Sequence, residues 1–317
     1  MADGLRRCRV CRSESSVTAG TLFAGTRTPL VSWFAAVWYV VNQKQGVSAL
    51  GLQRVLGLGS YQTAWAWLHT LRRAMVLPGR ELLSGVVEVD ESYIGARRRR
   101  RGGVGGRQLA GKAIIAIAIA VEGDQAPERV RIRRIPDVTN DTLTEFVLDN
   151  VARGSEVRTD GWQGYFDIAR YRFAHVVTNV SATGDPAHVV LPHVHLVSSL
   201  VKRWMLGTHQ GAVSHAQLDY YLDEFTFRFN RRRARHRGLL FYRLLEGAHA
   251  AEPQPYKALT GKSAAQPGLA WNRGSEGRYP VARKPSVVRP SASRSLANEP
   301  EVSRAQSWLP LRREAVG

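Results

Sequence analysis

The sequence predicts an α/β protein whose central unit is a mixed sheet flanked by helices, with a small helical region before it and an irregular tail after it. Strand-length apolar runs alternate with helical patterns in the middle of the chain, and the longest run spans residues 113–121. Two further β-prone runs, residues 86–89 and 156–159, lead directly to Asp90 and Asp160. Aromatic residues and glycine follow each aspartate within a few positions. The pattern favours an open sheet whose strand ends present acidic side chains.

Composition restricts the class of partner. The 317 residues include 45 Lys+Arg against 26 Asp+Glu, a formal net charge of +19, while 44% of the residues are hydrophobic. Such a chain folds rather than remaining a disordered polycation, and its charge predicts a polyanionic partner, most often DNA or RNA. A membrane surface is the rival, but no apolar run approaches the roughly 20 residues that span a bilayer. Two cysteines and no signal-peptide core fit a reducing cytoplasm.

The leader, residues 1–28, contains a Cys-x-x-Cys knuckle formed by Cys8 and Cys11. Such a knuckle is half of a zinc ribbon, because a structural zinc ion takes four ligands. No other cysteine follows, and the nearest histidine in sequence, His69, is far from ribbon spacing. We therefore expect a partial zinc-ribbon remnant and do not predict bound zinc in this chain alone.

Residues 29–77 follow helical spacing. Two short helical patterns, after Ser48 and after Ser60, flank a glycine turn at residues 57–59, and both serines are suited to cap helix N-termini. This is the helix-turn-helix pattern, in which the N-terminal end of the second helix reads bases in the major groove. Those positions are Tyr61, Gln62 and Thr63. The alternative is an ordinary helical hairpin whose apolar residues are core.

Residues 82–250 predict the α/β unit. Strands are expected at 86–89, 108–122, 129–135 and 156–159, and the third alternates with a basic outer face. Helices are expected at 140–151, 193–206 and 214–231. Three antiparallel strands followed by helix, strand and helix match the ribonuclease-H-like order. The last stretch, residues 251–317, is rich in Pro, Ser, Gly, Ala and Arg, so it predicts a disordered basic tail without a specific role.

Asp90 and Asp160 are the residues that indicate chemistry. Two carboxylates brought together from separate strands repel each other unless a cation lies between them. Hard oxygen ligands favour Mg²⁺ or Mn²⁺, and a pair of such ions on a basic protein points to phosphodiester chemistry on nucleic acid. The alternative is two solvated aspartates that cap turns.

Two arginine-rich runs predict contacts with the phosphate backbone, which add affinity rather than specificity. The alternative is a solvated charge run. The first run comprises Arg97, Arg98, Arg99, Arg100 and Arg101, and the second comprises Arg231, Arg232, Arg233, Arg235 and Arg237. Trp162, Tyr165 and Trp204 are suited to stack on a frayed DNA end, but core or rim packing is the expected role.

Taken together, several segments resemble the zinc-ribbon DDE transposases of bacterial insertion sequences, the ISXO-like group. The segments are GTLF at 20–23, TRTPL at 26–30, WF at 33–34, residues 52–65, VDESYIG at 89–95, TDGW at 159–162, LVKRW at 200–204, GTH at 207–209 and YLDEFTFRFNRR at 221–232. The resemblance covers about residues 6–248. It implies a ribonuclease-H-like domain with two divalent metals that acts on transposon ends, with Asp90 and Asp160 as the first two catalytic carboxylates. Lys202 matches a family lysine near the third position.

His195 occupies the third position, where the family usually has glutamate. An imidazole adds no negative charge, but it can bind a metal with a relative preference for Mn²⁺, or pass a proton to the leaving 3′-oxygen. The alternative is that His193 and His195 only face the DNA surface of a helix. Glu224 is the backup third carboxylate, although surface salt bridges are its expected role.

The resulting expectation is a transposase that cleaves double-stranded DNA and transfers strands, assembled as a homo-oligomer on DNA in the bacterial cytoplasm. A decayed transposase acting only as a DNA-binding protein, and a structure-specific nuclease, are the alternatives.

Overall fold

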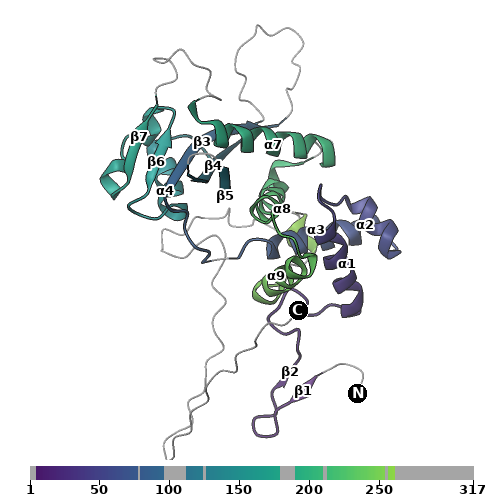
Figure 1. Ribbon diagram of the computed structural model, residues 1–317. Coiled ribbons are helices and arrows are strands. Elements are labelled where there is room, and N and C mark those ends of the chain that lie inside the picture. The colour runs from purple at the N-terminus through teal and green to yellow at the C-terminus, as the bar shows by residue number, and fades with distance from the viewer. Residues whose placement is uncertain are drawn as a thin grey trace, which may run out of the picture. The chain divides into compact units, whose positions relative to one another are not determined.

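The computed structural model describes residues 5–77, 79–95, 112–123, 126–178, 190–209, 213–253 and 256–260 (Figure 1). All of them lie within one compact unit, residues 1–282. The predicted phosphate-binding arginines at 97–101, and the tail beyond residue 260, lie outside the described residues. No helix among the described residues is long and apolar enough to cross a bilayer.

A five-stranded mixed sheet forms the centre of the α/β part. Its strands are β3 (Val86–Ile94), β4 (Ala113–Glu122), β5 (Ala126–Ile135), β6 (Glu156–Thr159) and β7 (Ala174–Val177), in the spatial order β5-β4-β3-β6-β7. β4 runs antiparallel to β3 and β5, whereas β6 and β7 run parallel to β3. This arrangement confirms the predicted ribonuclease-H-like mixed sheet. β7, the edge strand next to β6, was not predicted.

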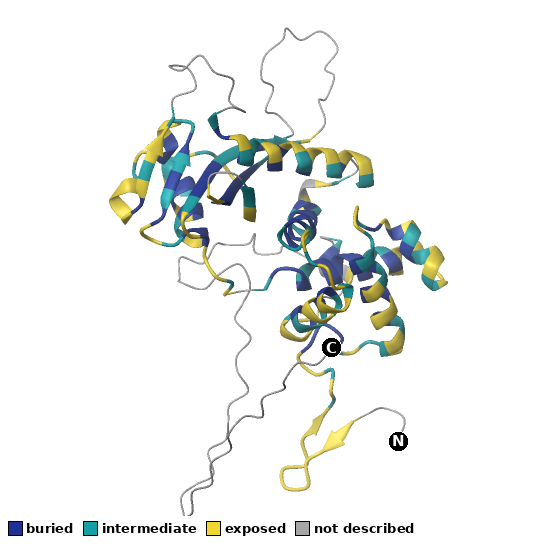
Figure 2. Ribbon diagram, in the orientation of Figure 1, coloured by how far each residue is buried: buried dark blue, intermediate teal, exposed yellow. Residues whose placement is uncertain are grey.

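Helices cover both faces of the sheet, and β4 shows why. Its isoleucines, Ile115, Ile117 and Ile119, point to the face covered by α7 (Pro192–His209) and α8 (Leu218–Asn230). The alanines between them point to the face covered by α4 (Asn140–Asn150). Because side chains alternate along a strand, a continuous apolar run is buried on both faces. Figure 2 shows the resulting buried centre of the sheet.

β5 differs from its prediction. The alternating arginines were expected on an exposed face, but Arg131 and Arg133 are buried. Arg133 donates to the Asp149 carboxylate on α4 at 2.6 Å, and Arg131 donates to the backbone carbonyl of Glu81 at 2.5 Å. Buried guanidinium groups are tolerated when they are paired in this way. The period-two pattern was correct, but the arginine side lies against the protein rather than against solvent.

A helical part packs around its own apolar core. It comprises α1 (Leu30–Asn42), α2 (Ala49–Leu56), α3 (Tyr61–Ala74) and α9 (Arg237–Ala250). Ser48 and Ser60 cap α2 and α3 by accepting hydrogen bonds from Gly51 N and Thr63 N. α2 ends at Gly57, whose φ of 63° is the left-handed conformation that glycine adopts most readily.

Several smaller elements occur in the described part of the chain. A hairpin of β1 (Arg6–Arg7) and β2 (Glu14–Ser15) carries the exposed Cys8 and Cys11. Three 3₁₀ turns, η1 (Gln163–Tyr165), η2 (Ile168–Tyr171) and η3 (His215–Gln217), link larger elements. α10 (Tyr256–Leu259) lies within the stretch predicted to be irregular.

A buried ion cluster joins the helical part to α8. Glu224 is 1% exposed, so its expected surface role is wrong. One of its oxygens accepts from Arg72 Nε on α3 at 2.7 Å, and the other accepts from Arg228 Nε and Nη2 at 2.9 and 2.7 Å. Burial raises the pKa of Glu224, but the two arginine charges outweigh burial and hold it at about 2. Because both oxygens are engaged, Glu224 is not available as a third site carboxylate.

Replacing Glu224 should therefore destabilise the fold. Glu224→Gln leaves Arg72 and Arg228 buried without a countercharge, and we expect a loss of about 3–5 kcal/mol in the free energy of unfolding. The matched control is Glu246→Gln, which breaks the exposed pair with Arg243 and should cost at most about 1 kcal/mol. Urea unfolding followed by circular dichroism measures both. Equal losses in the two variants would contradict the structural role of the cluster.

Candidate active site

Asp90 and Asp160 lie side by side because of the register between β3 and β6. The parallel pairs are Val86 with Glu156, Val87 with Val157 and Glu88 with Arg158. Continuing this register by two residues places Asp160, the first residue after β6, beside Asp90 on the neighbouring strand. Adjacent strands lie about 4.8 Å apart, so the two carboxylates share one edge of the sheet.

The environment of Asp90 differs from the prediction in one respect. β3 was expected to end at Val89, but it continues to Ile94, paired with β4 along its whole length. Asp90 is therefore a mid-strand residue at the point where the other neighbour, β6, stops. Asp160 is fixed by a turn, in which its Oδ1 accepts from Trp162 N at 3.0 Å and Gly161 takes a φ of 86°.

α7 is fixed along the same face of β3. The Glu88 carboxylate accepts from the backbone N–H groups of His193 and Val194 at 2.9 and 2.8 Å, and lies 2.7 Å from His193 Nδ1. Further along, the Ser92 and Ser198 hydroxyls are 2.7 Å apart. A carboxylate on the free N–H groups at a helix start is a strong anchor. Glu88 was missed by the sequence analysis, although a single acidic residue between two valines, two positions before Asp90, was a usable signal.

This anchoring brings His195 and Lys202 toward Asp90. His195 Nδ1 lies 3.8 Å from Asp90 Oδ2. Lys202 lies about two helical turns further along α7. Partial burial lowers the pKa of Lys202, and the Asp90 charge opposes that shift, so the ammonium lies within the field of the carboxylate. The chain thus places Asp90, Asp160, His195 and Lys202 in one neighbourhood.

The electrostatics of this neighbourhood favour an added cation. Burial raises the pKa of Asp90, the Asp160 charge raises it further, and His195 opposes the shift. Among the described residues, no group of three or more His, Cys, Asp or Glu side chains is arranged to hold a metal ion. The donors that are present, two carboxylates and one imidazole, are nonetheless types that divalent ions accept.

Glu91 is a further acidic residue that the sequence analysis missed. It points to the opposite face of β3 from Asp90, and burial together with the Asp90 charge raises its pKa to about 7. The fully buried Tyr165 hydroxyl is close enough to lower that pKa, although no hydrogen bond of good geometry joins it to Glu91 Oε1. The pattern Asp-Glu on one strand was the available signal.

The aromatic side chains considered for stacking mainly pack. Tyr165 is 0% exposed, and Trp204 Nε1 donates to Gln45 O at 2.8 Å. Trp162 is half exposed, and its Nε1 donates to Val138 O at 3.1 Å. Packing was the expected role for all three.

Those predicted DNA-binding residues that the structure describes lie on α3 and after α8. Tyr61, Gln62 and Thr63 occupy the exposed first turn of α3. After α8, the guanidinium groups of Arg231 and Arg232 lie over the rings of Phe227 and Phe229, at 4.3 and 4.1 Å. The next residue along, Arg233, is exposed.

The Cys-x-x-Cys pair lies apart from these residues, at the tip of the β1–β2 hairpin. Cys11 Sγ is 3.0 Å from Ser13 Oγ, a hydrogen bond that lowers the Cys11 pKa to about 7.

Glu91 makes stability depend on pH. Its pKa is about 7 in the folded chain against an ordinary 4.5, so the folded state retains a proton that the unfolded chain loses. The protonated Glu91 carboxyl therefore makes its full contribution to stability below the pKa of the unfolded chain, 4.5. That contribution is lost as pH rises through the folded-state pKa of about 7. Near pH 8, without divalent ions, the free energy of unfolding of the Glu91→Gln variant should exceed that of wild type by roughly 2–3 kcal/mol. Near pH 4.5 this difference should fall below about 1 kcal/mol.

Urea unfolding at both pH values measures this difference. Glu122→Gln, at the exposed end of β4, is the control and should change stability by no more than about 0.5 kcal/mol. Equal stability of wild type and Glu91→Gln near pH 8 would show that the Glu91 carboxyl is not held protonated.

Comparison with known proteins gives one family. A comparison with curated proteins finds no match. Among solved structures, the catalytic core domain of HTLV-2 integrase, determined with magnesium in a trimeric form, is similar over 46% of this chain and 84% of its own, at 12% identity and a TM-score of 0.27. At that TM-score we infer nothing from the similarity, and the strand order defines the fold. Residues 82–230 match the ISXO2-like transposase domain. This segment contains the five-stranded sheet, α4, α7, α8 and the Asp90–Asp160 pair, and it is similar to that family.

Proposed function

We propose that the protein is a transposase that cleaves DNA and transfers strands at insertion-sequence ends through a divalent-metal site. The observation that carries this proposal is the pairing of Asp90 with Asp160 on a chain with a net charge of +19. α7 adds an imidazole and an ammonium group to the same neighbourhood. The matched transposase family supports the reaction class.

Asp90, Asp160 and His195 would hold the metal, expected to be two Mg²⁺ or Mn²⁺ ions. The fit rests on the raised pKa of Asp90, which shows that burial and the Asp160 charge disfavour its ionised form. A bound cation reverses that penalty. When bound, such ions act as Lewis acids that stabilise charge on the transferring phosphoryl group.

The protein side chains contribute positioning and proton transfer. Because His195 Nδ1 faces Asp90, Nε2 is the nitrogen left for the site. It would either bind the metal or, where the two carboxylates hold the metal without it, pass a proton to the leaving 3′-oxygen. The Lys202 ammonium would bind a non-bridging phosphate oxygen near Asp90. Glu88 and Ser92 hold α7, so they position His195 without touching DNA.

Double-stranded DNA is the proposed partner, bound by a homo-oligomer in the cytoplasm. Tyr61, Gln62 and Thr63 would contact base edges from α3, and Arg233 would contact phosphate. Arg231 and Arg232 already pack on aromatic rings. Some of their guanidinium N–H groups would remain to bind phosphate. Cys8 and Cys11 would supply two of the four ligands of a zinc ion completed from elsewhere.

A DNA-binding protein without cleavage activity is the second candidate. The observation that favours it is His195, an imidazole at the position where related enzymes usually carry glutamate. Metal-dependent cleavage of DNA carrying the insertion-sequence ends separates the two candidates, because both of them bind DNA.

The paired carboxylates give the most direct mutational test. Asp90→Asn and Asp160→Asn keep the side-chain shape but remove the charge, so each should reduce cleavage by more than about a hundredfold while DNA affinity stays near wild type. Loss of a residue that only supports a ligand already costs about 10–100-fold. The control is Asp167→Asn, because Asp167 pairs with the exposed Arg170 outside the site. Cleavage is measured by mapping 3′-ends, and retained cleavage in either site variant would overturn the metal assignment.

His195 is tested by two substitutions. His195→Ala should lower cleavage by about 10²–10⁴-fold without weakening DNA binding, the range expected for a lost proton-transfer group. His195→Glu should preserve or raise activity, with a lower ratio of Mn²⁺- to Mg²⁺-supported rate, because carboxylate is a harder ligand than imidazole. His249→Ala, on the exposed end of α9, is the control. Wild-type cleavage by His195→Ala would place His195 outside the site.

A further inference from the structure

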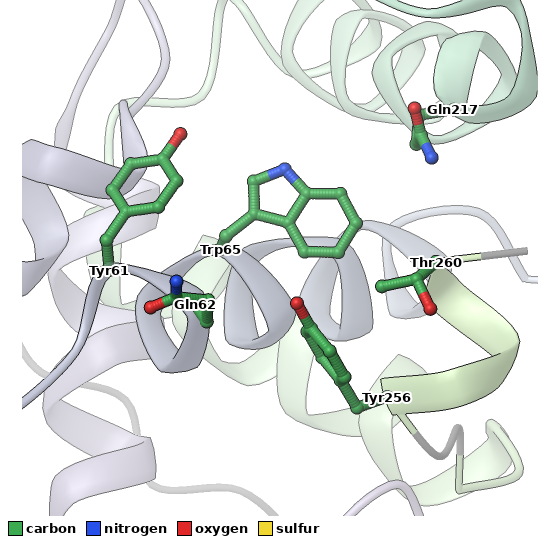
Figure 3. A pocket seen from close by; sticks show the side chains of 6 residues that line it. All are labelled: Tyr61, Gln62, Trp65, Gln217, Tyr256 and Thr260. Atoms are coloured by element: carbon green, nitrogen blue, oxygen red, sulfur yellow. The ribbon is translucent and has the colours of Figure 1, made fainter. Parts of the chain in front are cut away.

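A pocket at the start of α3 is separate from the Asp90–Asp160 site, and two of its lining residues, Tyr61 and Gln62, are among those proposed above to contact bases. Its volume is about 310 Å³, at the small end of the range for ligand sites. Three parts of the chain line it: the first turns of α3, the residue before α8, and α10 with the residue that follows it (Figure 3). The lining residues are Tyr61, Gln62, Trp65, Gln217, Tyr256 and Thr260.

Three of these side chains are aromatic and present ring surface to solvent. Tyr61 is 49% exposed and Tyr256 is 47% exposed. The Trp65 ring meets the Tyr256 ring edge-on, with centroids 6.2 Å apart and an angle of 78° between the planes. On its other side Trp65 packs against His69, with centroids 4.1 Å apart. These contacts fix the indole while leaving it partly accessible, which suits a surface on which a planar ring stacks.

The remaining lining groups are polar but uncharged. Gln62 and Gln217 each carry a carboxamide that both donates and accepts hydrogen bonds. Because no lining side chain is charged, the pocket does not suit a phosphate or a metal ion. A nucleobase is a neutral planar ring with donors and acceptors along its edge, and glutamine side chains pair with such edges.

We propose that this pocket binds one unpaired DNA base, stacked on the aromatic rings and held at its edge by the glutamine carboxamides. A base inside a duplex offers only its edge in a groove, so it has to leave the helix before its face can stack in a pocket. The inference rests on the proposed function in one respect, that DNA is the partner. It adds that DNA with an extruded base is bound in preference to a regular duplex.

The test uses the full chain and three duplexes that differ at one position. The first is fully paired, the second carries one extra unpaired adenine, and the third carries an extra abasic nucleotide at the same place. We expect the second to bind about tenfold more tightly than the other two, a difference of about 1.4 kcal/mol. The abasic duplex separates recognition of the base from easier deformation of the DNA.

Variants locate the effect. Tyr256→Ala and Gln217→Ala should each remove the preference, whereas Tyr256→Phe, which keeps the ring, should retain it. The matched control is Tyr242→Ala, which removes an exposed tyrosine on α9 outside the pocket (58% exposed, against 47% for Tyr256). Affinity for the fully paired duplex shows that each variant is folded. Tight but equal binding of all three duplexes, or a preference that survives both alanine variants, overturns the pocket assignment alone. Failure to bind any duplex overturns DNA as the partner as well.

Discussion

The parallel pairing of β3 with β6 is the constraint on which the site depends. It places Asp160 beside Asp90, and burial together with the neighbouring charge makes ionised Asp90 unfavourable. The folded chain retains this arrangement although it costs stability, which is the usual condition of a functional site rather than of a packing core. A divalent cation would relieve the repulsion, so the proposed metal binding would also stabilise this edge of the sheet.

α7 connects that pair to the rest of the molecule. Its first turn is held by Glu88 of β3, and Trp204 and Thr208 in its last two turns donate to the carbonyl of Gln45 at 2.8 and 2.6 Å. The neighbouring α8 is tied to α3 through Glu224 and Arg72. α3 also presents the residues proposed to contact DNA bases. The helix that carries His195 is therefore fixed both to β3 and to the helical part. DNA bound at α3, as proposed, would then be held in a defined position relative to Asp90.

Local sequence patterns were sufficient to predict most helices and strands, but they were insufficient to predict which distant segments pack against them. The apolar run of β4 and the serine caps of α2 and α3 depend on nearby residues, and each was predicted. β3 was predicted too short because Asp-Glu-Ser is a poor strand sequence, and it is extended by pairing with β4, a tertiary effect. Arg131, Glu91 and Glu224 look exposed in sequence, but their burial depends on segments far along the chain. Asp90, Asp160 and His195 remain predictions as catalytic residues, although the fold brings them together.

The central claim is that Asp90 and Asp160 form a site that requires a cation. The most direct measurement is the anomalous scattering of Mn²⁺ in crystals of the full chain grown with saturating manganese. We expect a peak at the two carboxylates that is absent from crystals of the Asp90→Asn variant. A map with no peak at this pair, or with manganese bound equally well in the variant, would contradict it.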